Sequence, residues 1–417
     1  MSMTSRRDRN EYRNEFHNKR HNENRNESPQ HANAIGRHAG ARSRTASLVI
    51  LIVAALVVVL GVTMGMNALR SQSMGSMGST GSMSATAPGT ATAPNASITA
   101  PASKSAVPTA DPGDIVMGVN GDENTIVLKG EQYLEAGAHA SEPTDGVLND
   151  RIRASGSVDT SKPGDYTVTY SVADSSGHVA HIDRTVHVVD SMDKQSGGVP
   201  VLMYHYVYSA SAAPDHRDAN YLLDSKLEEQ LNYLSANDFY YPSWQEVAAY
   251  VAGTHSLPKR SVVLTFDDGE EGFLHYGIPL LAKYRVPATS FVIASDADAS
   301  QKVVANANEF VQFQSHSFDM HRAGGTVGHG GRISAMTHAE IVDDLTKSTT
   351  IVGANQAFAY PFGDTTDDAR AAAREVGFLC AFTTKYGRTN TGDDPMALPR
   401  VRISGDQSLS SFEASVQ

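Results

Sequence analysis

Cysteine is nearly absent from this chain: the 417 residues contain one, Cys380. A single cysteine excludes an intrachain disulfide and a zinc site made of several thiolates. Cys380 lies in an apolar run, which predicts an ordinary buried thiol. The fold must therefore be stabilised by a hydrophobic core.

Positive charge is scarce outside the N-terminal tail. Residues 6–44 carry 10 Lys or Arg against 5 Asp or Glu, and the whole chain has a net charge of −12, so the rest carries about −17. Phosphate binding needs a basic surface. The acidic remainder therefore argues against nucleic acid as a partner, and it fits a neutral glycan better than an anionic polymer.

The first 112 residues contain little that predicts a folded core. Residues 1–45 have few large apolar side chains, which predicts a disordered tail. Residues 46–68 form an uncharged apolar run, long enough as a helix to span the roughly 30 Å hydrocarbon layer. Residues 69–112 are rich in Ser, Gly, Ala and Pro and are typical of a linker.

The charges around residues 46–68 predict how this run lies in a membrane. Arg37, Arg42 and Arg44 precede it, and only Arg70 follows closely. The positive-inside rule then puts the tail in the cytoplasm and the rest outside. A cleaved signal peptide is the alternative, but the polar leader is too long for one. We expect a single-pass plasma-membrane protein with an extracellular C-terminal part.

Residues 113–190 change character to short β-patterned runs. Apolar and polar residues alternate over 166–172 and again over 186–188, with a turn sequence between them. This pattern predicts an antiparallel hairpin in a small β-sandwich, with further strands at 125–128 and 133–140. The run from Gly156 to Tyr170 resembles the Ig-like repeats of bacterial surface proteins. Such repeats act as spacers or weak glycan binders.

Residues 198–417 alternate β-rich apolar runs with helical patterns, which predicts βα units and a parallel sheet. Ser243 with Glu246, and Thr337 with Glu340, are expected to form capping boxes at two helix starts. The expected strands cover residues 199–204, 262–266, 289–294, 310–313, 357–360 and 380–384.

Several of these predicted strands end in polar or turn-forming groups. They are His205, Asp267-Asp268, His316 and Pro361-Phe362-Gly363. In an α/β barrel, the carboxyl ends of the parallel strands converge on one mouth. We therefore expect these groups to meet in one place.

The sequence Thr265-Phe266-Asp267-Asp268-Gly269 is the first candidate for chemistry. One carboxylate could bind a metal ion while its neighbour acts as a base; an ordinary Asp-Asp-Gly turn is the alternative. His316 and His321 are five residues apart, so they could share an ion only from a loop or an irregular turn. One carboxylate and two imidazoles would leave open positions, as in catalytic zinc sites.

Together these motifs resemble the NodB-homology polysaccharide deacetylases, over about residues 198–403. The sequence carries Thr-Phe-Asp-Asp-Gly at 265–269, Ser-His-Ser at 315–317 and Ala-Tyr-Pro-Phe-Gly at 359–363. The opening Val-Pro-Val-Leu-Met-Tyr-His at 199–205 and Leu-Pro-Arg-Val at 398–401 are similar to the subgroup that deacetylates poly-N-acetylglucosamine. The resemblance implies a distorted β/α barrel and an enzyme that removes N-acetyl groups from a cell-surface or wall polysaccharide.

The resemblance also implies a role for individual residues. Asp267 would be the general base, and the backbone N–H of Phe362 would stabilise an oxyanion. The metal ligands would be Asp268, His316 and His321, holding zinc or another divalent cation. The substrate-binding residues would be Tyr360, Pro361 and Gly363.

Two departures from the family pattern concern the base and the general acid. The family's arginine before Pro-Phe-Gly is missing here, so Arg400 or Arg402 either replaces it or forms a plain structural ion pair. No histidine follows His338, so the family's later histidine is missing too. His205 is the candidate replacement as general acid.

Two further points limit the function. The Gly-rich residues 324–331 form either a lid or a surface insertion without function. They lack the signature of a phosphate-binding loop, which argues against nucleotide binding. An O-acetyl esterase acting on xylan or another acetylated glycan remains an alternative. So does a surface binding or scaffold protein with weak activity.

Overall fold

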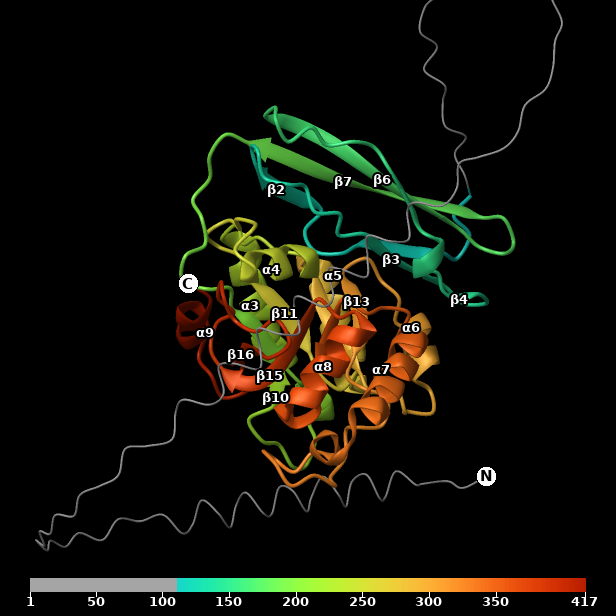
Figure 1. Cartoon of the computed structure of the whole chain (residues 1–417), viewed down its shortest axis with the longest axis vertical. Coiled ribbons are helices and arrows are strands. Elements are labelled where there is room, and N and C mark those ends of the chain that lie inside the picture. The colour runs from blue at the N-terminus through green and yellow to red at the C-terminus, as the bar shows by residue number, and fades with distance from the viewer. Residues whose placement is uncertain (1–110) are drawn as a thin grey trace, which may run out of the picture. The chain divides into compact units, whose positions relative to one another are not determined.

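Residues 111–417 are described by the computed structural model shown in Figure 1. The predicted tail at 1–45, the predicted membrane helix at 46–68 and nearly all of the predicted linker at 69–112 lie outside the described residues. Within residues 111–417, no helix is long and apolar enough to cross a membrane.

The first part of the described chain contains two β-sheets that form the predicted Ig-like module (Figure 1). One sheet has the strand order β1-β3-β4 and the other β2-β7-β6-β5. The strands are β1 Val116–Val119, β2 Asn124–Leu128, β3 Ala138–Glu142, β4 Gly146–Val147, β5 Arg153–Ser155, β6 Gly164–Ala173 and β7 Val179–Val189.

The long hairpin β6–β7 follows the predicted alternation. Val168, Tyr170 and Val172 are buried and meet Val186 in the core of the module, because side chains on alternate positions point to the same face. The strand expected at 133–140 begins only at Ala138. The residues before it form a loop in which the Glu135 carboxylate accepts the N–H of Gly137 at 2.8 Å.

The second part is a closed barrel of parallel strands. Going around it, the order is β11-β12-β13-β14-β15-β16-β8, and β16 pairs with β8 to close the sheet. The strands are β8 Val201–Tyr204, β11 Val263–Phe266, β12 Ala288–Val292, β13 Val311–Ser315, β14 Ala357–Ala359, β15 Cys380–Tyr386 and β16 Leu398–Arg402. A short parallel pair, β9 Tyr206–Tyr208 and β10 Tyr221–Leu223, follows β8.

Helices surround the barrel (Figure 1). They are α3 Asp224–Ala236, α4 Trp244–Val251, α5 Ile278–Tyr284, α6 Ala299–Ala305, α7 His338–Val352, α8 Asp367–Val376 and α9 Leu409–Val416. Both predicted capping boxes are present, at Ser243 on α4 and at Thr337 on α7. Cys380 is buried in the core, as expected.

Strand β16 was not among the predicted strands. It contains Pro399, which cannot donate a ladder hydrogen bond and therefore reads as a strand breaker. The structure tolerates it where the pairing of β15 with β16 shifts register, between Phe382 and Tyr386. This strand is important because it carries Arg400.

The Ig-like module contacts the barrel at the ends where its strands begin. His139 Nε2 donates to the carbonyl of Asn308, just before β13, at 3.0 Å, and Asn149 Nδ2 donates to the carbonyl of Gly353 after α7 at 3.0 Å. Ser256 donates through its N–H and its hydroxyl to Glu131. These polar contacts dock the module on the barrel.

Candidate metal and catalytic site

The two adjacent aspartates lie directly after the buried strand β11 and have different partners. Asp268 adopts a left-handed conformation, with φ of 75°, which is strained for a residue with a side chain. This turn lets Asp267 face Arg400 while Asp268 faces the two histidines. The different surroundings of the two carboxylates therefore have a backbone cause.

Asp268, His316 and His321 come together as the sequence predicted. The Asp268 Oδ1 atom lies 3.3 Å from His316 Nε2 and 3.2 Å from His321 Nε2. Two ligands bound tetrahedrally at about 2.0–2.1 Å from one zinc ion would be about 3.3 Å apart. The three side chains therefore fit one small cation.

The surroundings of the triad also fit a cation. The Oδ1 atom of Asp268 is buried and has no hydrogen-bond partner among the described residues, which is costly for a carboxylate oxygen. The Nδ1–H of His316 donates to the carbonyl of Ala359 at 2.7 Å, so its Nε2 carries the lone pair that a metal needs. The Tyr206 hydroxyl donates to the other Asp268 oxygen, Oδ2, at 3.0 Å. Sequence reasoning missed Tyr206, although it directly follows His205.

The segment between the two histidines is an irregular loop, as their spacing requires. Ser317 has φ of 71°, which turns the chain directly after His316. The Asp344 carboxylate on α7 accepts the N–H groups of Phe318 and Asp319 at 2.7 and 2.8 Å. A buried side chain far along the sequence therefore holds the loop that presents His321, and no local motif points to it.

Of the two candidate arginines, Arg400 is the one that pairs with Asp267. Its Nη1 and Nη2 atoms donate to the two oxygens of Asp267, both at 2.7 Å, and the Arg400 and Asp267 side chains are almost completely buried. Burial raises the pKa of Asp267, but the charge and hydrogen bonds of Arg400 outweigh it and hold the pKa below its usual value. Arg402 instead donates to Asn220.

His205 lies next to the same carboxylate. Its Nε2 is 3.9 Å from Asp267 Oδ2, too far for a hydrogen bond but within the same site. Burial lowers the pKa of His205, partly offset by the two aspartates. Its role as a general acid stays a prediction.

The segment Pro361–Gly363 forms a 3-10 turn after β14. Phe362 has φ of 60° and ψ of 0°, and its ring centroid lies 4.6 Å from that of His321. This strained turn therefore lies against the metal triad, which is where the backbone N–H of Phe362 was expected.

The predicted substrate contacts next to Phe362 have mixed outcomes. The Tyr360 side chain is buried in the core and its hydroxyl donates to the carbonyl of Met396 at 2.9 Å. Pro361 is buried as well. These side chains pack the wall behind the turn, so their placement does not support a direct contact with substrate; Gly363 is partly exposed.

The Gly-rich loop at 324–331 is tied to the same turn. The buried Asp364 carboxylate accepts the N–H groups of His329 and Gly331, each at 2.8 Å. A side chain at Gly331 would place its Cβ 2.9 Å from the Phe362 ring. The loop therefore packs beside the site. From the sequence, both a lid and a surface insertion without function were open.

Comparisons with known proteins agree with both parts of the chain. Residues 117–188 match the family described as bacterial surface protein, Ig-like domain, and residues 254–381 match the polysaccharide deacetylase family. A poly-beta-1,6-N-acetyl-D-glucosamine N-deacetylase of Staphylococcus aureus is 26% identical over 218 residues, covering 48% of this chain and 74% of the relative. Its namesake from Staphylococcus epidermidis is 27% identical over 199 residues, covering 44% and 68%.

The solved structures to which this chain is similar include a Streptococcus pyogenes deacetylase, PplD, in complex with acetate, and IcaB from Ammonifex degensii. The first is 21% identical with a TM-score of 0.45, covering 53% of this chain and all of that one. The second is 24% identical with a TM-score of 0.44, covering 54% and 98%. From the family matches and the relatives, we conclude that the chain carries a polysaccharide deacetylase domain preceded by a bacterial Ig-like domain.

Proposed function

We propose that this protein removes N-acetyl groups from a polysaccharide containing N-acetylglucosamine. The observation that carries the proposal is the orphaned Asp268 Oδ1 between two imidazoles, directly beside a carboxylate held by its own arginine. The two staphylococcal relatives are named as N-deacetylases of such a polymer, which supports the substrate class.

Each site residue has a task in this reaction. Asp268, His316 and His321 would hold zinc or another divalent cation, which, when bound, polarises the acetyl carbonyl and lowers the pKa of a water. Asp267 takes the proton of the attacking water, because a carboxylate keeps further lone pairs beyond the two that Arg400 occupies.

The remaining groups act on the intermediate and on its breakdown. The Phe362 N–H donates to the oxygen that becomes negative as water adds to the acetyl carbon. His205 gives a proton to the departing amine nitrogen, so the products are acetate and a free amino sugar. Arg400 keeps the Asp267 carboxylate in place throughout.

The test is acetate release by the full-length protein from short poly-N-acetylglucosamine chains, with acetylated xylan as a parallel substrate. We expect release from the first substrate that stops with a chelator and returns on adding zinc. Release from xylan alone would favour the O-acetyl esterase. No release from either, by a folded metal-loaded protein, would favour a scaffold.

We further propose, from the sequence pattern alone, that residues 46–68 anchor the protein in the plasma membrane with the deacetylase domain outside. The full-length protein should then sediment with membranes. A fragment starting between residues 71 and 100, found in the medium as the sole product, would contradict this proposal.

A further inference from the structure

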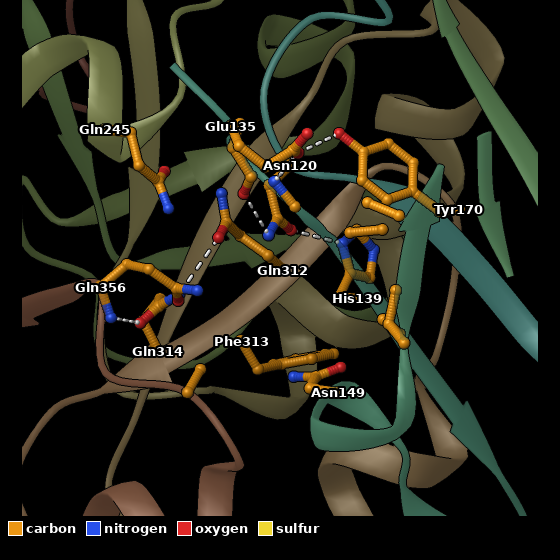
Figure 2. Close-up of a pocket in the computed structure, with 16 residues that line it drawn as sticks. Asn120, Glu135, His139, Asn149, Tyr170, Gln245, Gln312, Phe313, Gln314 and Gln356 are labelled. Atoms are coloured by element: carbon orange, nitrogen blue, oxygen red, sulfur yellow. Dashed lines mark hydrogen bonds between the residues drawn. The ribbon is translucent and has the colours of Figure 1, made fainter. Parts of the chain in front are cut away.

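A polar cavity of about 250 Å³ lies between the Ig-like module and the barrel (Figure 2). We call it the lower pocket. Glu135 and Ala154, which line it, are exposed, so it opens to solvent. Its amide-bearing lining residues are Asn120, Asn149, Gln245, Gln312, Gln314 and Gln356.

The lower pocket is separate from the metal site. Gln312 and Gln314 on β13 and His316 directly after it are alternate residues, so they share one face. That face points into the barrel, because Ser315, on the opposite face, bonds to Ser348 of the surrounding helix α7. The four-residue step from Gln312 to His316 covers about 13 Å at roughly 3.3 Å per residue. The pocket and the metal site thus lie toward opposite ends of the barrel.

The chemistry of the lower pocket favours an uncharged ligand. No Lys or Arg lines it. Burial lowers the pKa of His139 to about 4, so this imidazole is neutral at physiological pH. The one carboxylate, Glu135, already accepts hydrogen bonds from the Tyr170 hydroxyl and the Gly137 N–H.

A relay of amides directs one buried donor into the cavity. Gln314 Oε1 accepts the N–H groups of Gln356 and Ala357, both at 3.1 Å, which fixes the orientation of its amide. Its Nε2 then donates to Gln312 Oε1 at 3.1 Å. The Nε2 of Gln312 is therefore turned away from Gln314, as Figure 2 shows.

This donor faces the cavity rather than a partner among residues 111–417. The Gln312 side chain is only 7% exposed, but its Nε2 is not among the buried polar atoms that lack a partner, so solvent in the cavity reaches it and a ligand oxygen would replace that solvent. Gln245, half-buried at the start of α4, adds a second amide to the same cavity.

We propose that the lower pocket binds one uncharged N-acetylhexosamine residue of a glycan, with Gln312 Nε2 as a donor to it. The choice of sugar rests on the proposed function, whereas the uncharged, oxygen-rich character of the ligand rests on the pocket itself. The volume is below the roughly 300 Å³ at which drug-sized sites begin, so it suits a single ring.

The test measures sugar binding while the metal site is disabled. Full-length Asp268→Ala protein is titrated with N-acetylglucosamine and its short oligomers, and binding is followed by ligand-observed NMR. We expect this protein to bind the sugar, and the added change Gln312→Leu to weaken binding at least about tenfold, the worth of a buried hydrogen bond. Gln132→Leu, an exposed position outside the pocket lining, is the matched control and should bind like the parent.

Gln312 is the more deeply buried of the two glutamines, so its replacement is more liable to disturb folding. Gln245→Ala is therefore the second variant, and it should also weaken binding. The proposal is overturned if the Asp268→Ala protein binds no sugar, or if neither glutamine change weakens binding in a folded protein. Absence of acetate release by the metal-loaded protein without any substitution, with sugar binding intact, would contradict the proposed function alone. Acetate release without any sugar binding at the lower pocket would contradict this inference alone.

Discussion

The two ends of the barrel use strained backbone for different purposes. Where the strands end, Asp268, Ser317 and Phe362 have positive φ, and each belongs to or adjoins the candidate site. Where strands begin, the positive φ values of Asp238 and Arg285 occur as helices α3 and α5 finish, a common way to end a helix. Positive φ values therefore occur in or beside the candidate site at the first end and at ordinary helix ends at the second.

The polar groups of the two ends differ in the same way. At the first end, charged groups are buried in pairs or face an orphaned carboxylate oxygen. At the second, amides and a neutral imidazole join the barrel to the Ig-like module, together with the Glu131 carboxylate and the exposed Arg285–Glu123 ion pair. Changes at the first end should therefore affect mainly metal binding and catalysis, and changes at the second end mainly stability.

The largest effect is expected for Asp268→Ala. Two imidazoles alone rarely hold a catalytic ion, so the folded variant should lose its metal and its acetate release should fall to background. Metal content and acetate release are measured on the same sample. His316→Ala and His321→Ala should behave alike; a fully active, metal-loaded variant would show that this is not the site.

Asp267→Asn should separate the two adjacent carboxylates. It should keep its metal and lose activity by about 10² to 10⁴, the usual contribution of a general base. The same paired measurements check it. If Asp267→Asn loses metal while Asp268→Ala keeps it, the two roles are exchanged.

Tyr206→Phe should weaken zinc binding about tenfold, because the hydroxyl that holds Asp268 Oδ2 is lost. Zinc titration with a competing chelator measures the change. Tyr208→Phe, on the same strand β9, is the control and should leave zinc affinity as it is. Equal affinities for all three proteins would mean that Tyr206 does not orient the ligand.

Removal of residues 113–190 tests the second end. The barrel should melt at a lower temperature, because the polar contacts at Asn308, Gly353 and Ser256 lose their partners. Acetate release per folded molecule from a small chito-oligomer should stay within a few-fold, since the metal triad lies at the opposite end. An unchanged melting temperature would show the module to be a spacer, and a total loss of activity would show that it builds the site.

The smallest effect is expected from His139. Its pKa in the folded protein, about 4, lies below the ordinary value of 6.5, so the unfolded chain binds more protons between these values. Folding stability should therefore fall as the pH decreases from 6.5 to 4. Urea unfolding at pH 7 and pH 5 should show a larger loss for the parent than for His139→Gln. Equal losses would mean that His139 does not titrate in this range.

Patterns within short stretches of sequence identified much of this protein. The Asp-Asp-Gly turn, the histidine pair and the capping boxes each lie within a few residues of chain, so their geometry follows from local conformation and strand direction. The alternation in β6 and β7 likewise predicted the hairpin. Pro399 hid strand β16, because a local pattern cannot show that a register shift will accommodate it.

Tertiary structure alone decided what joins distant segments. Arg400 and Arg402 are equally plausible partners for Asp267 in the sequence, but only Arg400 reaches the carboxylate, whereas Arg402, two residues further along β16, donates to Asn220. Asp344 supports the His321 loop from helix α7, and the carbonyl of Asn308, just before β13, bonds to His139 of the Ig-like module across 169 residues of chain. Such contacts depend on how barrel closure and domain docking place remote residues, whereas the metal triad depends mainly on where strands β11 and β13, on either side of β12, end.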